Sequence, residues 1–122
     1  MDIKKLDKVF SEYIRRRDAD EYGRVKCCTC PNTFHWSEMD AGHFVRRGNL
    51  SVRFHEMNCH AQCKECNQFK YGMEAEHYVY IANRYNEGTP LHLIQLGRSG
   101  VKFMQFEIDE MTEKYKLKIR DL

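Results

Sequence analysis

Apolar residues recur at helical spacing near both ends of the chain. Near the start, this spacing predicts an amphipathic helix over residues 3–17, with apolar positions at Ile3, Leu6, Val9, Phe10, Tyr13 and Ile14. Beyond Gly72 it predicts a helix that ends at Gly88 and a short helix that begins at Thr89 and Pro90. A long last helix follows, and its apolar side consists of Phe103 or Met104, Ile108, Met111 and Tyr115.

The middle of the chain has the shorter periodicity of β-strands. We expect a hairpin with one strand over residues 41–45 and a returning strand over residues 50–54, joined by a turn at residues 46–49. A helix is predicted to follow over residues 63–72, because a glycine stands where it would end. The centre of the chain therefore has the order strand, strand, helix.

Length and composition indicate one small domain. The chain has 122 residues and contains no repeats or linkers rich in Pro and Ser. We divide this single α+β domain into an N-terminal helical part (1–22), a core (23–72) and C-terminal helices (73–122). No apolar run is long enough to cross a membrane and the start lacks a signal peptide, so we expect a cytoplasmic protein.

Four of the six cysteines form two C-x-x-C pairs, Cys27 with Cys30 and Cys63 with Cys66. Each such turn presents two sulfur atoms to one point, and two turns can close a tetrahedral shell around zinc. Without a secretion signal the chain should meet a reducing cytosol, where zinc sites are more common than disulfides. We therefore expect these four residues to hold a structural Zn²⁺.

Three neighbours of these pairs have less specific roles. Cys28 and Cys59 are expected to be small buried residues, although Cys28 could compete with Cys27 for zinc. His60 is expected to pack beside the cysteine cluster or to bind one of its ligands.

Between and just after the cysteine pairs stand residues suited to activating water beside a hard metal ion. His43 is the candidate general base, because a neutral imidazole can accept a proton near physiological pH. The side-chain oxygens of Asp40 and Asn67 suit Mg²⁺ or Mn²⁺. Residues three apart on a regular strand point to opposite faces, so Asp40 can join His43 only if a bulge or turn at Gly42 redirects it.

These segments resemble the HNH, or ββα-metal, nuclease motif, most clearly in the run Asn58–Asn67 that contains the second cysteine pair. More closely, they are similar to the NinG family of phage proteins, also called Rap. The similar segments are Arg17–Asp20, His35–Phe44 and Gln62–Asn67. The resemblance covers nearly the whole chain, and the cysteine layout is also similar to that of endonuclease VII-type resolvases.

The resemblance implies a small zinc-stabilised ββα-metal core with flanking helices. It also implies a metal-dependent endonuclease that cuts branched or recombining phage DNA, such as a Holliday junction or a D-loop, in the host cytoplasm. In the HNH pattern His43 is the first histidine, Asn58 the middle asparagine and Asn67 the last position, so all three are candidate catalytic residues. Asn58 has a second expected role, since a turn-forming asparagine can tie the hairpin loop to the helix through backbone hydrogen bonds.

The formal net charge of +2 is nearly balanced, so any nucleic-acid footprint must be local. We expect Arg46, Arg47, Arg53 and Lys70 to contact DNA, because they lie in or after the segment that carries His43. The expected partner is therefore DNA, and no membrane is involved. Symmetrical cutting of a junction would favour a homodimer, for which the apolar last helix could supply the contact.

Two other functions are consistent with the same cysteines. A zinc-binding DNA-binding module without catalysis would need the four-cysteine shell alone. A structural or adaptor protein of the phage replication apparatus would need neither cleavage nor affinity for branched DNA. His43 and Asn67 distinguish the nuclease from both, because a protein that only binds has no need of either.

Overall fold

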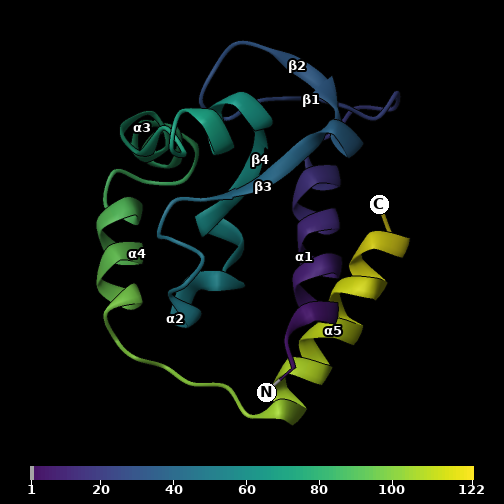
Figure 1. Cartoon of the computed structure of the whole chain (residues 1–122), viewed down its shortest axis with the longest axis vertical. Coiled ribbons are helices and arrows are strands. Elements are labelled where there is room, and N and C mark those ends of the chain that lie inside the picture. Colours follow the sequence, from purple (N-terminus) through teal and green to yellow (C-terminus); the bar gives the residue numbers. More distant parts are fainter. Residues whose placement is uncertain (1) are drawn as a thin grey trace.

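The computed structural model describes residues 2–122 and shows a small mixed α+β protein (Figure 1). Its helices are α1 (Lys4–Arg17), α2 (Leu50–Arg53), α3 (Glu74–Arg84), α4 (Thr89–Gly97) and α5 (Gln105–Arg120). Its strands are β1 (Arg24–Lys26), β2 (Thr33–His35), β3 (Met39–His43) and β4 (Cys59–Cys63). Short 3-10 turns span Trp36–Glu38 and Glu56–Asn58, and the π-helical turn η3 spans Glu65–Phe69. Within residues 2–122, none of the helices is long and apolar enough to cross a membrane.

The first and last helices lie side by side along one edge of the molecule (Figure 1). Leu6, Phe10 and Ile14 are buried on α1, and the ring of Phe10 stands nearly perpendicular to that of Tyr115 on α5, 4.9 Å away. The helices expected at the two ends of the chain are thus confirmed. The apolar side of α5, which we expected to supply a dimer contact, is instead buried against α1 at Ile108 and Tyr115.

The central hairpin has a different second strand from the one predicted. β3 pairs antiparallel with β4, from Met39 opposite Cys63 to His43 opposite Cys59, whereas residues 50–53 form the helix α2. The prediction of a returning strand over residues 50–54 is therefore wrong. All five residues of β4 are buried and two of them are polar, so the strand lacks the alternation by which half-buried strands are recognised. The predicted helix over residues 63–72 is the shorter turn η3.

The two faces of the β3–β4 ribbon are covered by different elements. α1 packs on one face, while on the other His60 contacts His77 of α3 through their Nδ1 and Nε2 atoms, 3.0 Å apart. The Nε2 atom of His60 also lies 2.8 Å from the hydroxyl of Tyr85. The expected place of His60 beside the cysteines is therefore wrong, since its ring lies among α3 residues. Burial lowers the pKa of His60 to about 2 and that of His77 to about 4, so both rings are neutral.

Asn58 ties the long loop between β3 and β4 to the ribbon. Its side chain is fully buried, and its Oδ1 accepts a hydrogen bond of 2.8 Å from the backbone N–H of Val45. Its Nδ2 donates to the carbonyl oxygens of Val45 and Val52, at 3.1 and 3.2 Å. These are the loop-tying contacts that a turn-forming asparagine was expected to make, and they leave the side chain no polar atom facing solvent.

Replacing Asn58 by Ala should destabilise the fold. The change leaves the half-buried N–H and carbonyl of Val45 and the buried carbonyl of Val52 without their partner, so we expect the free energy of unfolding to fall by about 2–4 kcal/mol. Urea unfolding followed by circular dichroism measures it. Asn32→Ala is the matched control, because Asn32 is exposed and its side chain should contribute less than about 0.5 kcal/mol. Equal stability of the two variants would contradict the tying role.

Candidate functional site

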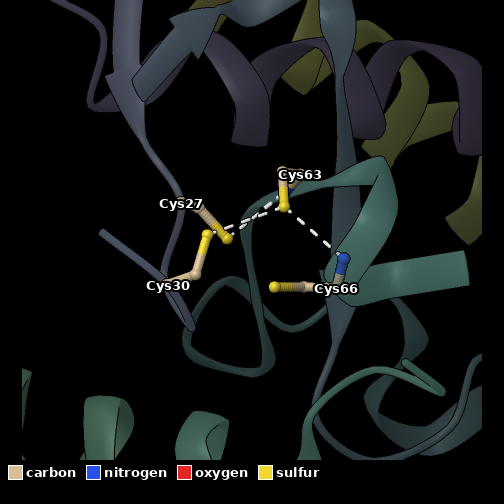
Figure 2. Close-up of side chains that lie close together, drawn as sticks. All are labelled: Cys27, Cys30, Cys63 and Cys66. Atoms are coloured by element: carbon tan, nitrogen blue, oxygen red, sulfur yellow. Dashed lines mark hydrogen bonds between the residues drawn. The ribbon is translucent and has the colours of Figure 1, made fainter. Parts of the chain in front are cut away.

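The two cysteine pairs meet at one end of the ribbon. Cys27 and Cys30 lie in the loop between β1 and β2, Cys63 ends β4, and Cys66 lies in η3. Their sulfur atoms all lie within 4.8 Å of one another and point toward a common centre (Figure 2). Tetrahedral zinc with Zn–S bonds of about 2.3 Å needs sulfur atoms roughly 3.8 Å apart, and those of Cys30 and Cys63 are 3.7 Å apart. The four cysteines can therefore hold a metal ion such as zinc.

Backbone amides already point at this sulfur cluster. The N–H of Cys63 donates to the sulfur of Cys27 at 3.3 Å, and the N–H of Cys66 donates to that of Cys63 at 3.4 Å (Figure 2). The pKa of Cys27 is lowered to about 3, mainly by a hydrogen bond from the Cys28 thiol, whereas burial acts to raise it. Burial raises the pKa of Cys30, Cys63 and Cys66. A bound cation would offset that effect and favour four thiolates.

The two remaining thiols are buried outside the cluster, as expected. Cys28 hydrogen-bonds its backbone N–H to the carbonyl of Ala61, so that it is part of the packing between the cysteine loop and β4. The sulfur of Cys59 lies 3.7 Å from the carbonyl oxygen of Arg53, in the core formed with α1 and α5. Within residues 2–122, the sulfur cluster therefore contains Cys27 and not Cys28.

Asp40 of β3 and Asn67 of η3 are brought into contact. The Nδ2 atom of Asn67 donates to Asp40 Oδ2 at 2.9 Å, and so does the Nε2 atom of Gln68 at 2.8 Å. The other carboxylate oxygen accepts from Lys64 Nζ at 2.8 Å. Burial raises the pKa of Asp40, but the hydrogen bonds from Lys64, Asn67 and Gln68 outweigh it and lower the pKa overall. The carboxylate is therefore ionised and already binds a cationic group.

His43, the candidate base, ends β3. Its Nε2 atom lies 3.0 Å from the carbonyl oxygen of Arg53, which can only accept a hydrogen bond, so the neutral ring carries its proton on Nε2 and its lone pair on Nδ1. Burial lowers the pKa of His43, against smaller opposing contributions from the backbone of Arg53 and Ala41. The ring is therefore neutral at pH 7.

The bulge or turn at Gly42 that would be needed to redirect Asp40 toward His43 does not occur. The β3–β4 register runs without interruption from Met39 to His43, so Asp40 and His43 leave the strand on opposite faces. Gly42 has another use, because a Cβ atom there would lie 2.2 Å from the side-chain oxygen of Gln62. Both Asp40 and His43 nevertheless line a single open groove of about 1060 Å³.

This groove is bordered by α1, by the loop after β3 and by the segment that follows η3. It is rich in cations: those among its lining residues are Lys4, Lys8, Arg15, Arg46, Arg47 and Lys64. Acidic side chains are fewer there, namely Asp7, Asp40 and Glu74. The net positive lining favours a polyanion over a neutral or acidic ligand.

The four residues expected to contact DNA differ in their surroundings. Arg46 is exposed and lines the groove. Arg47 also lines it, but one of its nitrogens binds Asp7 of α1 at 3.0 Å. Arg53 donates through two nitrogens to the same Asp7 carboxylate and is only 17% exposed, so its role in this structure is to anchor the loop to α1. Lys70 is exposed, forms an ion pair with a glutamate of η3, and is not among the groove-lining residues.

Three residues at this site were not predicted. Gln68 and Lys64 bind Asp40, and their positions next to Asn67 and Cys63 are a signal that could have identified them. Asp7 is different, because its arginine partners lie 40 and 46 residues further along the chain. No local pattern on an amphipathic helix distinguishes such an aspartate from a solvent-exposed one.

The fold and the site define a small α+β protein whose four clustered cysteines can hold a metal ion. The chain belongs to the NinG family, since the family model described as Bacteriophage Lambda NinG protein matches residues 2–122.

Similar curated proteins carry the same name. Protein ninG of Escherichia phage 933W is 30% identical over 121 residues, which are 98% of this chain and 57% of that protein. Those of Escherichia phage lambda and Salmonella phage P22 are each 28% identical over 121 residues, covering 98% of this chain and 56% and 57% of theirs. The chain thus spans little more than half the length of these relatives. No solved structure matches it.

The cluster predicts how the protein responds to loss of a cysteine. We expect the purified protein to carry one zinc ion per chain, and Cys63→Ser to lose both the zinc and the cooperative unfolding transition. Structural zinc contributes on the order of 10 kcal/mol of apparent binding energy in small domains. Elemental analysis and thermal unfolding measure the two effects.

Cys59→Ala is the control for that experiment. Its sulfur lies outside the cluster, so this variant should keep its zinc even if the small cavity lowers its melting temperature. A Cys63→Ser protein that retains stoichiometric zinc and an unchanged melting curve would contradict the metal centre.

Proposed function

We propose that this protein is a metal-dependent DNA endonuclease of the HNH type that hydrolyses phosphodiester bonds in branched or recombining phage DNA. The observation that carries the proposal is the contact between Asp40 and Asn67 in a groove that His43 also lines. A carboxylate, an amide and a neutral imidazole are the groups that metal-assisted hydrolysis needs. The order β3, β4, η3 agrees with the strand, strand, helix order of a ββα-metal core.

In this proposal His43 removes a proton from the attacking water. Its Nδ1 atom has the lone pair for this step, because the carbonyl of Arg53 keeps the proton on Nε2. The same carbonyl fixes the plane of the ring, so the base would be oriented before the substrate arrives. Arg53 is itself held by Asp7 of α1, which makes the first helix part of the support for the base.

Asp40 and Asn67 would hold Mg²⁺ or Mn²⁺ through oxygen atoms. Since Asn67 uses its Nδ2 to reach Asp40, its Oδ1 remains available as a ligand. The ion would offset the negative charge that develops on the departing 3′ oxygen. In this structure Lys64 binds one oxygen of Asp40. When DNA binds, Lys64 would leave that carboxylate for a DNA phosphate, since a lysine can bind either group.

The lining of the groove supports DNA as the substrate. Its six cations outnumber its three acidic residues, and Arg46, Lys4 and Lys8 are exposed. Such a surface binds the phosphate backbone without reading sequence, and affinity should fall as salt rises. The resemblance to HNH nucleases further implies that cleavage leaves 5′ phosphate and 3′ hydroxyl ends.

A second candidate is a zinc-binding DNA-binding module without catalysis. The observation in its favour is that the residues expected to do chemistry also make structural contacts: Asp40 binds three side chains and His43 binds the Arg53 carbonyl. Such contacts would exist in a protein that only binds DNA. Cleavage assays with divalent metal separate the two functions.

Replacing His43 should abolish cutting without abolishing binding. With Mg²⁺ or Mn²⁺, the parent protein should nick or resolve forked and four-way DNA, and His43→Ala and His43→Gln should cut about 10²–10⁴-fold more slowly. Gel assays on labelled substrates measure the rates, and binding is measured without divalent metal. His92→Ala is the control, because His92 is exposed on α4 and does not line the groove.

Both His43 variants should retain zinc and a cooperative melting transition, which separates a chemical effect from loss of the fold. If the His43 variants cut as fast as His92→Ala, His43 is not the base. If the folded, zinc-bound parent cuts none of the branched or linear DNAs with either metal, the nuclease proposal itself fails.

The pH dependence of cleavage should reflect the lowered pKa of His43. A base whose pKa lies below the usual 6.5 is more than half deprotonated, and therefore mostly active, at pH 6.5. We expect kcat/KM to keep more than half of its plateau value at pH 6.5 and to decline with unit slope at lower pH. A decline that is already half complete above pH 6.5 would show that His43 is not the group that titrates.

A further inference from the structure

Tyr71 is the most exposed aromatic side chain at the groove. The residue is 90% exposed, the largest value among the large hydrophobic residues of the described chain, and it lines the groove that contains Asp40 and His43. It stands four residues after Asn67. Phe69 is also exposed, at 76%, but is not among the groove-lining residues. The ring of Tyr71 is thus accessible to a ligand that binds in the cationic groove.

The backbone under Tyr71 is held in an uncommon conformation. Tyr71 has a φ of 55°, and the next two residues, Gly72 and Met73, also have positive φ values of 87° and 49°. A non-glycine residue in the left-handed region costs free energy, and such residues cluster at sites of function. The three-residue left-handed run turns the chain away from η3 and leaves the ring of Tyr71 in the groove.

This segment is anchored on both sides. The N–H of Gly72 donates to the carbonyl of Cys66 at 2.8 Å, and the carbonyl of Gly72 accepts from the Gln62 side chain at 2.8 Å. The backbone N–H of Lys70 also donates a hydrogen bond of 2.9 Å to the carbonyl oxygen of Glu65. The ring therefore projects from a backbone fixed to β4 and to a residue of the cysteine cluster, and not from a loose loop.

We infer that Tyr71 stacks on an unpaired or unstacked DNA base next to the scissile phosphate, so that the groove prefers DNA whose helix is interrupted. This rests on the proposed function, because it requires DNA in the groove. The cations of the groove hold the phosphate backbone, and an aromatic ring supplies a surface for the flat face of any base. In an intact duplex both faces of each base are covered by neighbours. At a branch point one face is free, and Tyr71 would cover it.

Binding without cleavage tests this inference. In EDTA, so that no strand is cut while the tightly held zinc is verified by elemental analysis, fluorescence anisotropy would compare a forked DNA with a linear duplex of equal length. Tyr71→Ala should bind the fork about 5–100-fold more weakly than the parent, and the linear duplex within about 2-fold. The emission of a 2-aminopurine placed at the branch point should be quenched by the parent and not by Tyr71→Ala.

Three further variants make the result specific. Tyr71→Phe keeps the ring and should behave as the parent, whereas Tyr71→Gly should lose fork binding while melting at or above the parent temperature, because glycine accepts the positive φ. Tyr22→Ala is the matched control, since Tyr22 is 75% exposed and lies outside the groove-lining residues. It should bind both DNAs as the parent does.

Several outcomes would overturn the inference. Unchanged fork affinity of Tyr71→Ala, an equal loss on fork and duplex, or no binding of either DNA by the parent would each do so. These results are separable from the nuclease proposal. A parent that binds forks through Tyr71 but never cuts them removes the nuclease alone, and a parent that cuts while Tyr71→Ala binds and cuts normally removes the stacking role alone.

Discussion

The arrangement of this protein depends on the convergence of four sulfur atoms from three separate segments. The loop between β1 and β2, the end of β4 and the turn η3 meet at the cysteine cluster, where Cys27, Cys63 and Cys66 belong to one buried hydrophobic cluster. Asn67 directly follows one of these cysteines, and Asp40 lies opposite Gln62, next to another. A cation at the cluster would therefore fix both the fold of this end of the ribbon and the distance between the carboxylate and the amide.

The two candidate metal sites use different donor atoms. Thiolates select soft or borderline ions such as zinc, whereas a carboxylate with an amide oxygen suits magnesium or manganese. Because η3 carries both Cys66 and Asn67, and the strand β3 with Asp40 pairs with the strand β4 that ends at Cys63, the sulfur atoms and the oxygen atoms lie on adjacent parts of one small scaffold. Mg²⁺ or Mn²⁺ would not displace zinc from the four thiolates, because these hard ions prefer oxygen ligands.

Local sequence patterns predict some parts of this structure, whereas other parts depend on contacts between distant segments. The end helices follow from regular apolar spacing, and the cysteine cluster follows from two spaced pairs that need each other. The prediction of the returning strand failed because His60 and Gln62 occupy buried positions whose hydrogen-bond partners lie on α3, in the cysteine loop and in the segment after η3. Likewise, the Asp7 contacts with two arginines depend on how α1 docks, which no local pattern records.

The anchored run from Cys66 to Met73 has a thermodynamic consequence. Its hydrogen bonds to β4 and η3 fix the carboxamide of Asn67 and the ring of Tyr71 on the same rigid backbone. The conformational entropy of ordering this surface is lost once, when the chain folds, and not again each time a ligand arrives. Binding here should consequently be governed by whether the ligand already has the complementary shape, with discrimination expressed mainly in how fast ill-fitting ligands dissociate.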